Sequence, residues 1–277
     1  MLWLLNWLFS PAKTKAPSEI DLYWLQAGMQ HFDNGEFDQA IAAYDKLLLA
    51  QPRHTTILVK RAEAYLEKAD FEKAWDGCEA ALAIDPHFAP AYYFQARIAQ
   101  IAGQPERAIM LLADCLRADP TFYPAHVECG MCLHNLGQLQ EALGHYNRAT
   151  ELRPFSGSAY YRRAMIWLAF EQFDRALSDL DASLQFDPEW VWALAHRASV
   201  RLLHDDYAGC IADYAELLRR APEIADADVF NNLASAHYLC GDFAHALAYQ
   251  TIAVEMAPAE LKESFSVQLR TIEAKLA

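Results

Sequence analysis

Apolar residues along this chain recur at the spacing of amphipathic helices. In "PAYYFQARIAQI" (90–101) and "PERAIMLLADCLRA" (105–118) they form one stripe per helix, with polar residues on the other side. Pro90 opens the first of these helices and Pro124 opens a later one, at a position where proline costs no helical hydrogen bond. The pattern predicts pairs of helices, repeated along the chain.

Prolines mark the period of this pattern. Successive prolines lie 34 residues apart until Pro222, and the last lies 36 further on, with the two extra residues near "EIADAD" (223–228). They are Pro52, Pro86, Pro120, Pro154, Pro188, Pro222 and Pro258. Twelve residues before each proline lies a small residue: Ala40, Ala74, Ala108, Ala142, Ala176, Cys210 and Ala246. A fixed period of this length indicates a repeat architecture.

The 34-residue period resembles the tetratricopeptide repeat (TPR) family, whose pattern runs W-x2-L-G-x2-Y, then A-x3-F, then P. The first unit matches it at Trp24, Gly28, Ala40, Tyr44 and Pro52, and the fourth at Gly130, Ala142, Tyr146, Ala149 and Pro154. Departures include His31 and Arg201 at the Tyr position, and Glu171 and Asp205 in place of the turn glycine. The resemblance implies an all-α fold, a right-handed superhelical solenoid of antiparallel helix pairs.

The repeat divides the chain into three parts. Residues 1–20 are an apolar tail and a linker, residues 21–260 are seven repeat units, and residues 261–277 are a C-terminal capping helix. The predicted units are 21–54, 55–88, 89–122, 123–156, 157–190, 191–224 and 225–260. In the capping helix, Leu261, Phe265, Leu269, Ile272 and Leu276 form an apolar stripe. A single helix pair cannot bury its apolar faces, so neighbouring units must stack and the ends need caps.

The composition of the chain indicates a folded protein and excludes one class of partner. Apolar residues make up 54% of the 277 residues, which is ample for a continuous core. The formal net charge is −14, so the surface would repel a phosphate backbone, and we expect no nucleic-acid binding.

The stretch "HVECGMCLH" (126–134) concentrates two cysteines and two histidines. At about 100° of rotation per residue, Cys132 and His134 project to nearly opposite sides of one helix, which argues against a shared metal ion. Cys129 stands at the packed Leu position of the repeat. The six cysteines are therefore interpreted as packing residues in a reducing compartment, and we expect a cytoplasmic chain, either free or peripheral to a membrane.

No catalytic motif is evident. The chain lacks a nucleophile elbow, a phosphate loop, HExxH and a dinucleotide fingerprint. The stretch "YLCGDFAHALAYQ" (238–250) contains the repeat's own glycine and alanine, so ordinary turn and core positions account for it. We expect a non-enzymatic chain with no cofactor and no metal.

The resemblance also implies where a partner binds, because TPR arrays usually hold a peptide or helix in a concave groove lined by the first helices. The corresponding residues here include aromatic and arginine side chains of the kind found at binding hot spots. The predicted contact residues are Tyr93, Phe94, Arg97, Tyr161, Arg162, Met165, Trp192, His196 and Asn231. The predicted function is a scaffold or adaptor for a partner protein.

The residues of the predicted groove indicate which kind of partner segment it can bind. Chaperone-binding TPR arrays clamp a C-terminal carboxylate with a lysine and an asparagine four residues apart, but Leu25 and Met29 occupy those positions here. A mixed apolar and basic groove instead suits a segment with hydrophobic anchors and some acidic residues, or an amphipathic helix.

The N-terminal stretch "MLWLLNWLF" (1–9) leaves alternatives open. It is too short to span a bilayer, which takes about 20 apolar residues. Through Trp3, Leu4, Trp7 and Phe9 it could anchor weakly to a membrane surface or a partner, plug a groove, or pack on the first repeat. The alternative function is therefore a membrane-surface-associated assembly factor, and self-association stays open.

Overall fold

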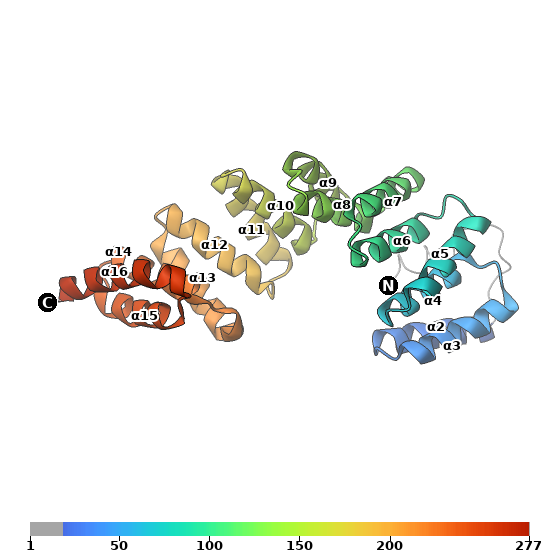
Figure 1. The fold of residues 1–277 in the computed structure, drawn as a ribbon, viewed down its shortest axis with the longest axis horizontal. Coiled ribbons are helices and arrows are strands. Elements are labelled where there is room, and N and C mark those ends of the chain that lie inside the picture. Colours follow the sequence, from blue (N-terminus) through green and yellow to red (C-terminus); the bar gives the residue numbers. More distant parts are fainter. Residues whose placement is uncertain (1–18, 277) are drawn as a thin grey trace. The chain divides into compact units, whose positions relative to one another are not determined.

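The computed structural model describes residues 19–276, and helices account for nearly all of them (Figure 1). The α-helices are α2 (Glu19–Asp33), α3 (Phe37–Ala50), α4 (Thr55–Glu67), α5 (Phe71–Ile84), α6 (Ala89–Ile101), α7 (Pro105–Ala118), α8 (Tyr123–Asn135), α9 (Leu139–Leu152), α10 (Gly157–Ala169), α11 (Phe173–Phe186), α12 (Val191–Leu203), α13 (Tyr207–Arg220), α14 (Ala227–Leu239), α15 (Phe243–Met256) and α16 (Ala259–Leu276). A 3-10 helix, η1 (Pro222–Ile224), occupies the longer loop before α14. Residues 19–276 contain no strand, and the predicted all-α fold is confirmed.

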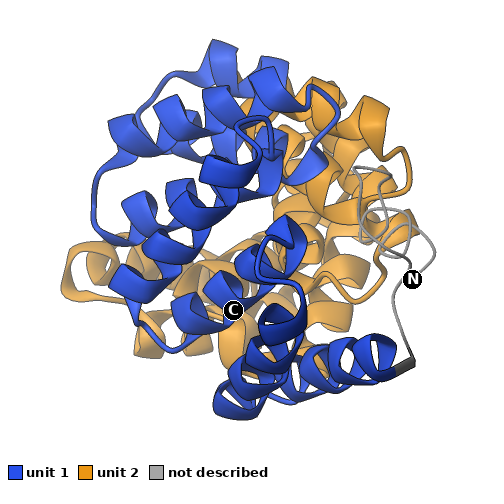
Figure 2. Cartoon of the chain, turned by 90° about the vertical axis from the view of Figure 1, so that its right-hand side faces the viewer, with its two compact units in different colours: residues 1–145 blue, residues 146–277 orange. Residues whose placement is uncertain are grey.

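The chain divides into two compact units, with the boundary after His145, inside α9 (Figure 2). In unit 1, each helix from α2 to α7 packs against the helix that follows it, and α4 and α6, the first helices of their pairs, also touch each other. In unit 2, α10 to α16 follow the same rule, except that η1 intervenes before α14, and α12 also touches α14. Helices joined by turns this short form antiparallel hairpins, the building block of helical repeats.

Small residues allow the two helices of a pair to approach closely. The residues twelve positions before each repeat proline, Ala40 to Ala246, are at most 1% exposed, including Cys210. Gly28 of α2 faces Tyr44 of α3 so closely that a Cβ atom on it would lie 2.6 Å from the tyrosine ring. Shape matching of this kind fills the interior without voids.

The turn inside each helix pair ends the first helix with one residue in the left-handed conformation. Glycine supplies it at Gly35, Gly103, Gly137 and Gly241, with φ between 69° and 79°. The same conformation occurs at Ala69, Glu171 and Asp205, with φ between 57° and 59°. Glycine is suited to this position because it lacks the Cβ that crowds the backbone there. The repeat therefore imposes the turn even where the residue type disfavours it.

We expect Ala69→Gly and Glu171→Gly to stabilise the fold by about 0.5–1 kcal/mol each, because they relieve left-handed strain of about 1–2 kcal/mol less the entropic cost of glycine. Asp205→Gly should gain less, because aspartate tolerates this conformation and its carboxylate accepts a hydrogen bond from Tyr207 Oη (2.5 Å). Urea unfolding checks these values.

Gly35→Ala is the matched control. Nothing lies within 4 Å of a Cβ added there, so the backbone conformation alone should cost it about 1 kcal/mol. Equal stability of Gly35→Ala and the wild type would contradict the assignment of strain to these turns.

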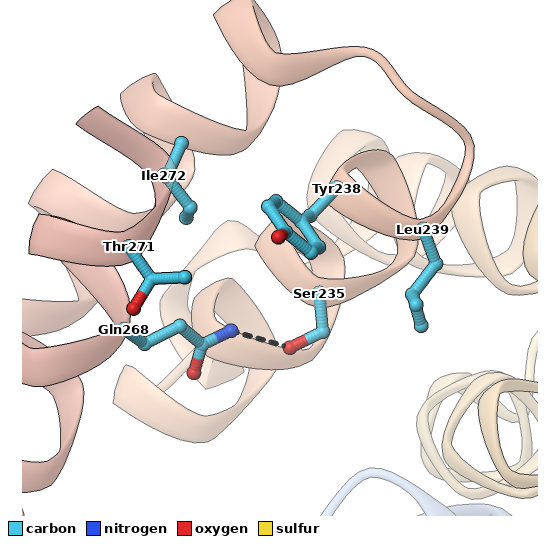
Figure 3. A pocket seen from close by; sticks show the side chains of 6 residues that line it. All are labelled: Ser235, Tyr238, Leu239, Gln268, Thr271 and Ile272. Carbon is cyan, nitrogen blue, oxygen red and sulfur yellow. Dashed lines mark hydrogen bonds between the residues drawn. The ribbon is translucent and has the colours of Figure 1, made fainter. Parts of the chain in front are cut away.

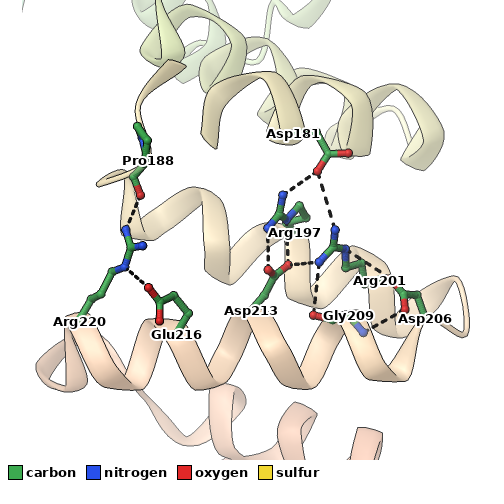
Figure 4. Close-up of polar contacts among 9 residues, drawn as sticks. All are labelled: Asp181, Pro188, Arg197, Arg201, Asp206, Gly209, Asp213, Glu216 and Arg220. Atoms are coloured by element: carbon green, nitrogen blue, oxygen red, sulfur yellow. Dashed lines mark hydrogen bonds and ion pairs between the residues drawn. The ribbon is translucent and has the colours of Figure 1, made fainter. Parts of the chain in front are cut away.

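A network of arginines and aspartates ties α11, α12 and α13 together in unit 2 (Figure 4). Asp213 is 4% exposed and accepts hydrogen bonds from Arg197 Nε (2.9 Å) and Nη2 (2.7 Å), and from Arg201 Nη1 (2.9 Å). Arg197 Nη1 also donates to Asp181 of α11 (2.7 Å). Arg201, which departs from the repeat's Tyr, is thus a member of the network. One repeat unit earlier, Arg163 donates two hydrogen bonds from Nε and Nη2 to the buried carboxylate of Asp179, as Arg197 does to Asp213.

Asp213→Asn should lower the free energy of unfolding by about 3 kcal/mol, since it leaves two partly buried arginines without their shared carboxylate. Asp181→Asn is the control, because Asp181 also pairs with Arg197 but is more than half exposed; it should cost less than about 1 kcal/mol. Chemical denaturation of both variants provides the test, and similar costs would show that burial does not set the strength of these pairs.

The last helix, α16, begins at Ala259 and packs on α15. Phe265 and Ile272 of its predicted stripe are buried. Leu261 and Leu276, at the two ends of that stripe, are exposed. The helix is longer than the surface it covers, so only the middle of its apolar stripe contributes to the core.

Candidate binding surface

The first helices of consecutive pairs are joined by side-chain contacts within each unit. In unit 1, Arg97 of α6 reaches Glu67 of α4 (3.3 Å), and Gln100 of α6 donates to Glu128 of α8 (3.1 Å). In unit 2, the rings of Tyr161 in α10 and His196 in α12 lie 5.8 Å apart. Side chains of α4, α6 and α8 in unit 1, and of α10 and α12 in unit 2, therefore contact one another along the first helices.

The predicted contact residues of unit 1 have different environments. Phe94 is 8% exposed and belongs to the core, with the guanidinium of Arg97 over its ring at 5.8 Å. Tyr93 is half-buried, packs edge-on against Phe94 and Phe122, and burial raises the pKa of its hydroxyl to about 12. Phe94 is thus a packing residue, because Arg97 and Tyr93 cover it, whereas Tyr93 and Arg97 reach the surface.

Unit 2 carries an aromatic cluster at the corresponding place. The ring of Tyr161 lies 5.6 Å from Trp190 and 5.8 Å from His196. Burial lowers the pKa of His196, so its imidazole is neutral at pH 7. Trp192, two residues after Trp190, is 49% exposed. The cluster thus consists of three partly buried rings, and the exposed ring of Trp192 lies on the same helix as His196.

Arg162 and Met165 lie on α10 beside this cluster. Met165 packs partly into the same core as Tyr161. Arg162 Nε is out of contact with solvent and has no hydrogen-bond acceptor within residues 19–276; the same holds for Trp190 Nε1. A buried donor without an acceptor costs about 1–3 kcal/mol. Unit 2 therefore contains, on α10 and just before α12, two buried polar groups without a partner among the described residues.

Asn231, the last predicted contact residue, serves the interior. Its Oδ1 accepts a hydrogen bond from Gln250 Nε2 (3.1 Å), and Gln250 also donates to the backbone oxygen of Phe265 (3.0 Å). Gln250 is fully buried at the position where the repeat pattern has Phe. Asn231 helps to satisfy this buried amide, so its carbonyl oxygen is already engaged.

A shallow pocket of about 230 Å³ opens between α14 and α16. Figure 3 shows its lining side chains, among them Tyr238 and Ile272, and the hydrogen bond from Gln268 Nε2 to Ser235 Oγ (2.8 Å). It has no charged lining residue, and it is small for a ligand site.

The cysteines agree with the packing interpretation, since five of the six are buried and all are free thiols. Burial raises the pKa of Cys78, Cys129 and Cys210 to about 12 each. In the "HVECGMCLH" stretch, Cys132 Sγ accepts a hydrogen bond from Gln100, and His126 contacts His145 and the backbone oxygen of Pro120. These side chains join neighbouring helices.

We expect a thiol reagent to label native protein at one cysteine, Cys240, which is exposed, and all six after unfolding. Cys240→Ser should abolish labelling of the native chain. Rapid labelling of more than one thiol in the folded wild type would contradict the buried placement of the others.

The proposed anchor residues Trp3, Leu4, Trp7 and Phe9 lie outside the described residues. Among the described helices, none combines the length and the apolar character required to cross a bilayer.

Family models confirm the repeat. Two tetratricopeptide repeat models match, one over residues 25–87 and one over residues 99–165. The chain belongs to the tetratricopeptide repeat family. Proteins of this family are generally non-catalytic scaffolds for protein interactions.

Curated relatives match at low identity. BBSome complex member BBS4 of Bos taurus is 24% identical over 61% of this chain and 33% of its own length. DnaJ homolog subfamily C member 3 of Homo sapiens is 28% identical over 50% of the chain and 30% of its own length. Hsp70-Hsp90 organizing protein 1 of Glycine max is 22% identical over 71% of the chain and 41% of its own length. The chain thus spans less than half of each of these proteins.

Solved structures share the fold. PilF of Pseudomonas aeruginosa aligns with a TM-score of 0.68 at 18% identity, over 77% of this chain and 97% of PilF. A chain of the APC/C hetero-tetramer Cut9-Hcn1 aligns with a TM-score of 0.64 at 17% identity, over 93% of this chain and 50% of that one. At such identities the likeness concerns the fold alone.

Proposed function

We propose that this protein is a non-catalytic adaptor that binds a segment of a partner protein on the surface of its first helices. The core of the proposed site in unit 2 is Tyr161, Arg162, Met165, Trp192 and His196. Tyr93 and Arg97 form a second contact area in unit 1. In the TPR family this surface lines the concave groove.

One observation carries the proposal: the first-helix face of unit 2 combines an exposed tryptophan with buried donors that lack acceptors. Trp192 exposes half of its surface. Arg162 Nε and Trp190 Nε1 are buried without a partner within the described residues. An incoming segment would bury the exposed side of Trp192, and Arg162, which is half-buried, could turn its guanidinium outward to pair with an oxygen atom of that segment. Tryptophan and arginine are also the residues that most often dominate the energy of protein interfaces.

The charges of the site indicate the chemistry of the segment. His196 is neutral at pH 7, so Arg162 supplies the positive charge among the five core residues. A carboxylate or a backbone carbonyl is the acceptor that suits a guanidinium. The proposed partner segment therefore carries an apolar anchor for Trp192 and an acidic residue close to it.

The decisive variants are Trp192→Ala and Arg162→Met. Binding peptides are first selected from a displayed library with the purified wild-type chain as bait. These peptides should contain an apolar residue and an acidic residue. Trp192→Ala should weaken binding of the best peptide about tenfold or more, while its exposed position keeps the change in stability near 0.5 kcal/mol. Arg162→Met should also weaken binding, yet leave stability equal or up to about 1 kcal/mol higher, because it removes a buried donor without an acceptor. Titration calorimetry and thermal unfolding measure the two effects.

Met110→Ala is the control, since Met110 is 70% exposed but lies on the second helix α7. Peptide affinity unchanged in Trp192→Ala and Arg162→Met, or reduced equally in Met110→Ala, would refute the proposed surface. Tyr161 is a poorer probe, because its contacts with Trp190 and His196 make truncation costly to the fold.

The relatives support an adaptor in general terms, since BBS4 is by name a member of a complex and another relative is an Hsp70-Hsp90 organizing protein. The alternative function, attachment to a membrane surface, depends on residues 1–9 and stays a prediction.

A further inference from the structure

Two histidines and an aspartate converge at the turn of the last helix hairpin, α14–α15. His237 Nδ1 lies 3.1 Å from Asp242 Oδ2, and His245 Nδ1 lies 2.7 Å from the same oxygen. The three ligand atoms all lie within 4.8 Å of one another. Among residues 19–276, this is the one group of three or more histidine, cysteine, aspartate or glutamate side chains arranged closely enough to share an ion.

The backbone of the turn fixes this arrangement. Asp242 N–H donates to the oxygen of His237 (2.9 Å) and Gly241 N–H to that of Tyr238 (3.0 Å), the paired hydrogen bonds that close a helix around a left-handed glycine. Asp242 then begins α15 as its N-cap, and His245, three residues later, donates its backbone N–H to Asp242 Oδ1 (3.3 Å). A side chain at this third position reaches back to the cap.

We propose that His237, Asp242 and His245 form a binding site for a divalent transition-metal ion of the zinc class. The ligands are the two Nδ1 atoms and Oδ2. Tetrahedral ligands about 2.05 Å from zinc lie about 3.3 Å apart, so each imidazole nitrogen need move only slightly from its present hydrogen-bond distance of 3.1 or 2.7 Å to the carboxylate for an ion to enter. Nitrogen donors with one carboxylate favour zinc and its neighbours over calcium or magnesium, which prefer oxygen.

The chemistry of the side chains is compatible with an ion. A neutral imidazole can move its proton to Nε2, so Nδ1 becomes a ligand without net loss of a proton. Asp242 Oδ1 accepts the backbone N–H of His245, while Oδ2 faces the two imidazoles. The ring of His237 is mostly buried and stacks on Tyr249 at 5.5 Å, which holds it in place. His245 is exposed, so solvent or a partner can reach the remaining coordination position.

The first helix hairpin, α2–α3, supplies an internal comparison. His31 Nδ1 pairs with Glu36 across the same turn, and Glu36 N–H donates to the oxygen of His31 (2.8 Å). The residue three positions after Glu36 is Gln39, where the last hairpin has His245. The first hairpin thus offers two ligands and the last one three.

The experiment is titration calorimetry of the full, tag-free chain, stripped with EDTA, against ZnCl2, with the visible spectrum of Co²⁺ as a second readout. The expected result is one ion per chain and a higher melting temperature with zinc. His237→Gln, His245→Gln and Asp242→Asn should each weaken zinc binding at least about tenfold. His245→Gln gives the last hairpin the residue pattern of the first, and Asp242→Asn keeps a good N-cap while it removes the charge.

His31→Gln is the matched control and should bind zinc like the wild type. Melting of each variant in EDTA shows that the hairpin still folds. The proposal is overturned by a wild type that takes up no zinc, and equally by zinc affinity that survives in His245→Gln or falls in His31→Gln. The peptide-binding surface plays no part in this assay, so the proposed function stands or falls separately.

Discussion

The close approach of the two helices in each pair is the constraint on which the rest of the structure depends. At the contact between them nothing larger than alanine or cysteine occurs, and these residues are almost completely buried from Ala40 to Ala246. A larger side chain would separate the helices and expose the ring or aliphatic group that fills the space four residues later, such as Tyr44 or Leu112. Every pair must therefore keep the same close distance between its two helices.

The close approach of the two helices also accounts for the short turns between them, and the charged network of unit 2 lies between helices packed in the same way. Two helices held this closely leave room for only a very short connection, so the left-handed residue persists at Ala69 and Glu171 without glycine. Between α11, α12 and α13, Asp213 receives two arginines, and one repeat unit earlier Asp179 of α11 receives Arg163 of α10. A buried carboxylate is tolerated because both guanidinium groups reach it with good geometry, and it adds directional contacts to packing that is otherwise non-directional.

The sequence predicts the helices, their pairing and the small buried residues, because these repeat seven times and each unit supports the others. It does not predict which of two adjacent aromatic residues faces outward: Tyr93 reaches the surface and Phe94 does not, a difference of 100° that periodicity alone cannot assign. It also missed the role of Asn231, because that role depends on Gln250, which is 19 residues away and buried where an apolar residue is expected. The histidine cluster was overlooked for a related reason. Each of its residues fits the repeat singly, and the signal is the spacing H-x4-D-x2-H across a turn.

Positions that the repeat does not restrict are the natural place for function. In the register of Arg162, successive units carry glutamine, lysine, phenylalanine, glutamate, arginine, histidine and asparagine, so no requirement of the fold selects arginine there. In the register of Ala176, by contrast, only alanine and one cysteine occur. An arginine at the first kind of position, with a buried Nε that has no acceptor within the described residues, is a cost that packing does not explain. His245 is a second position of this kind. It lies three residues after the N-cap Asp242, where the turn needs a backbone N–H but no imidazole.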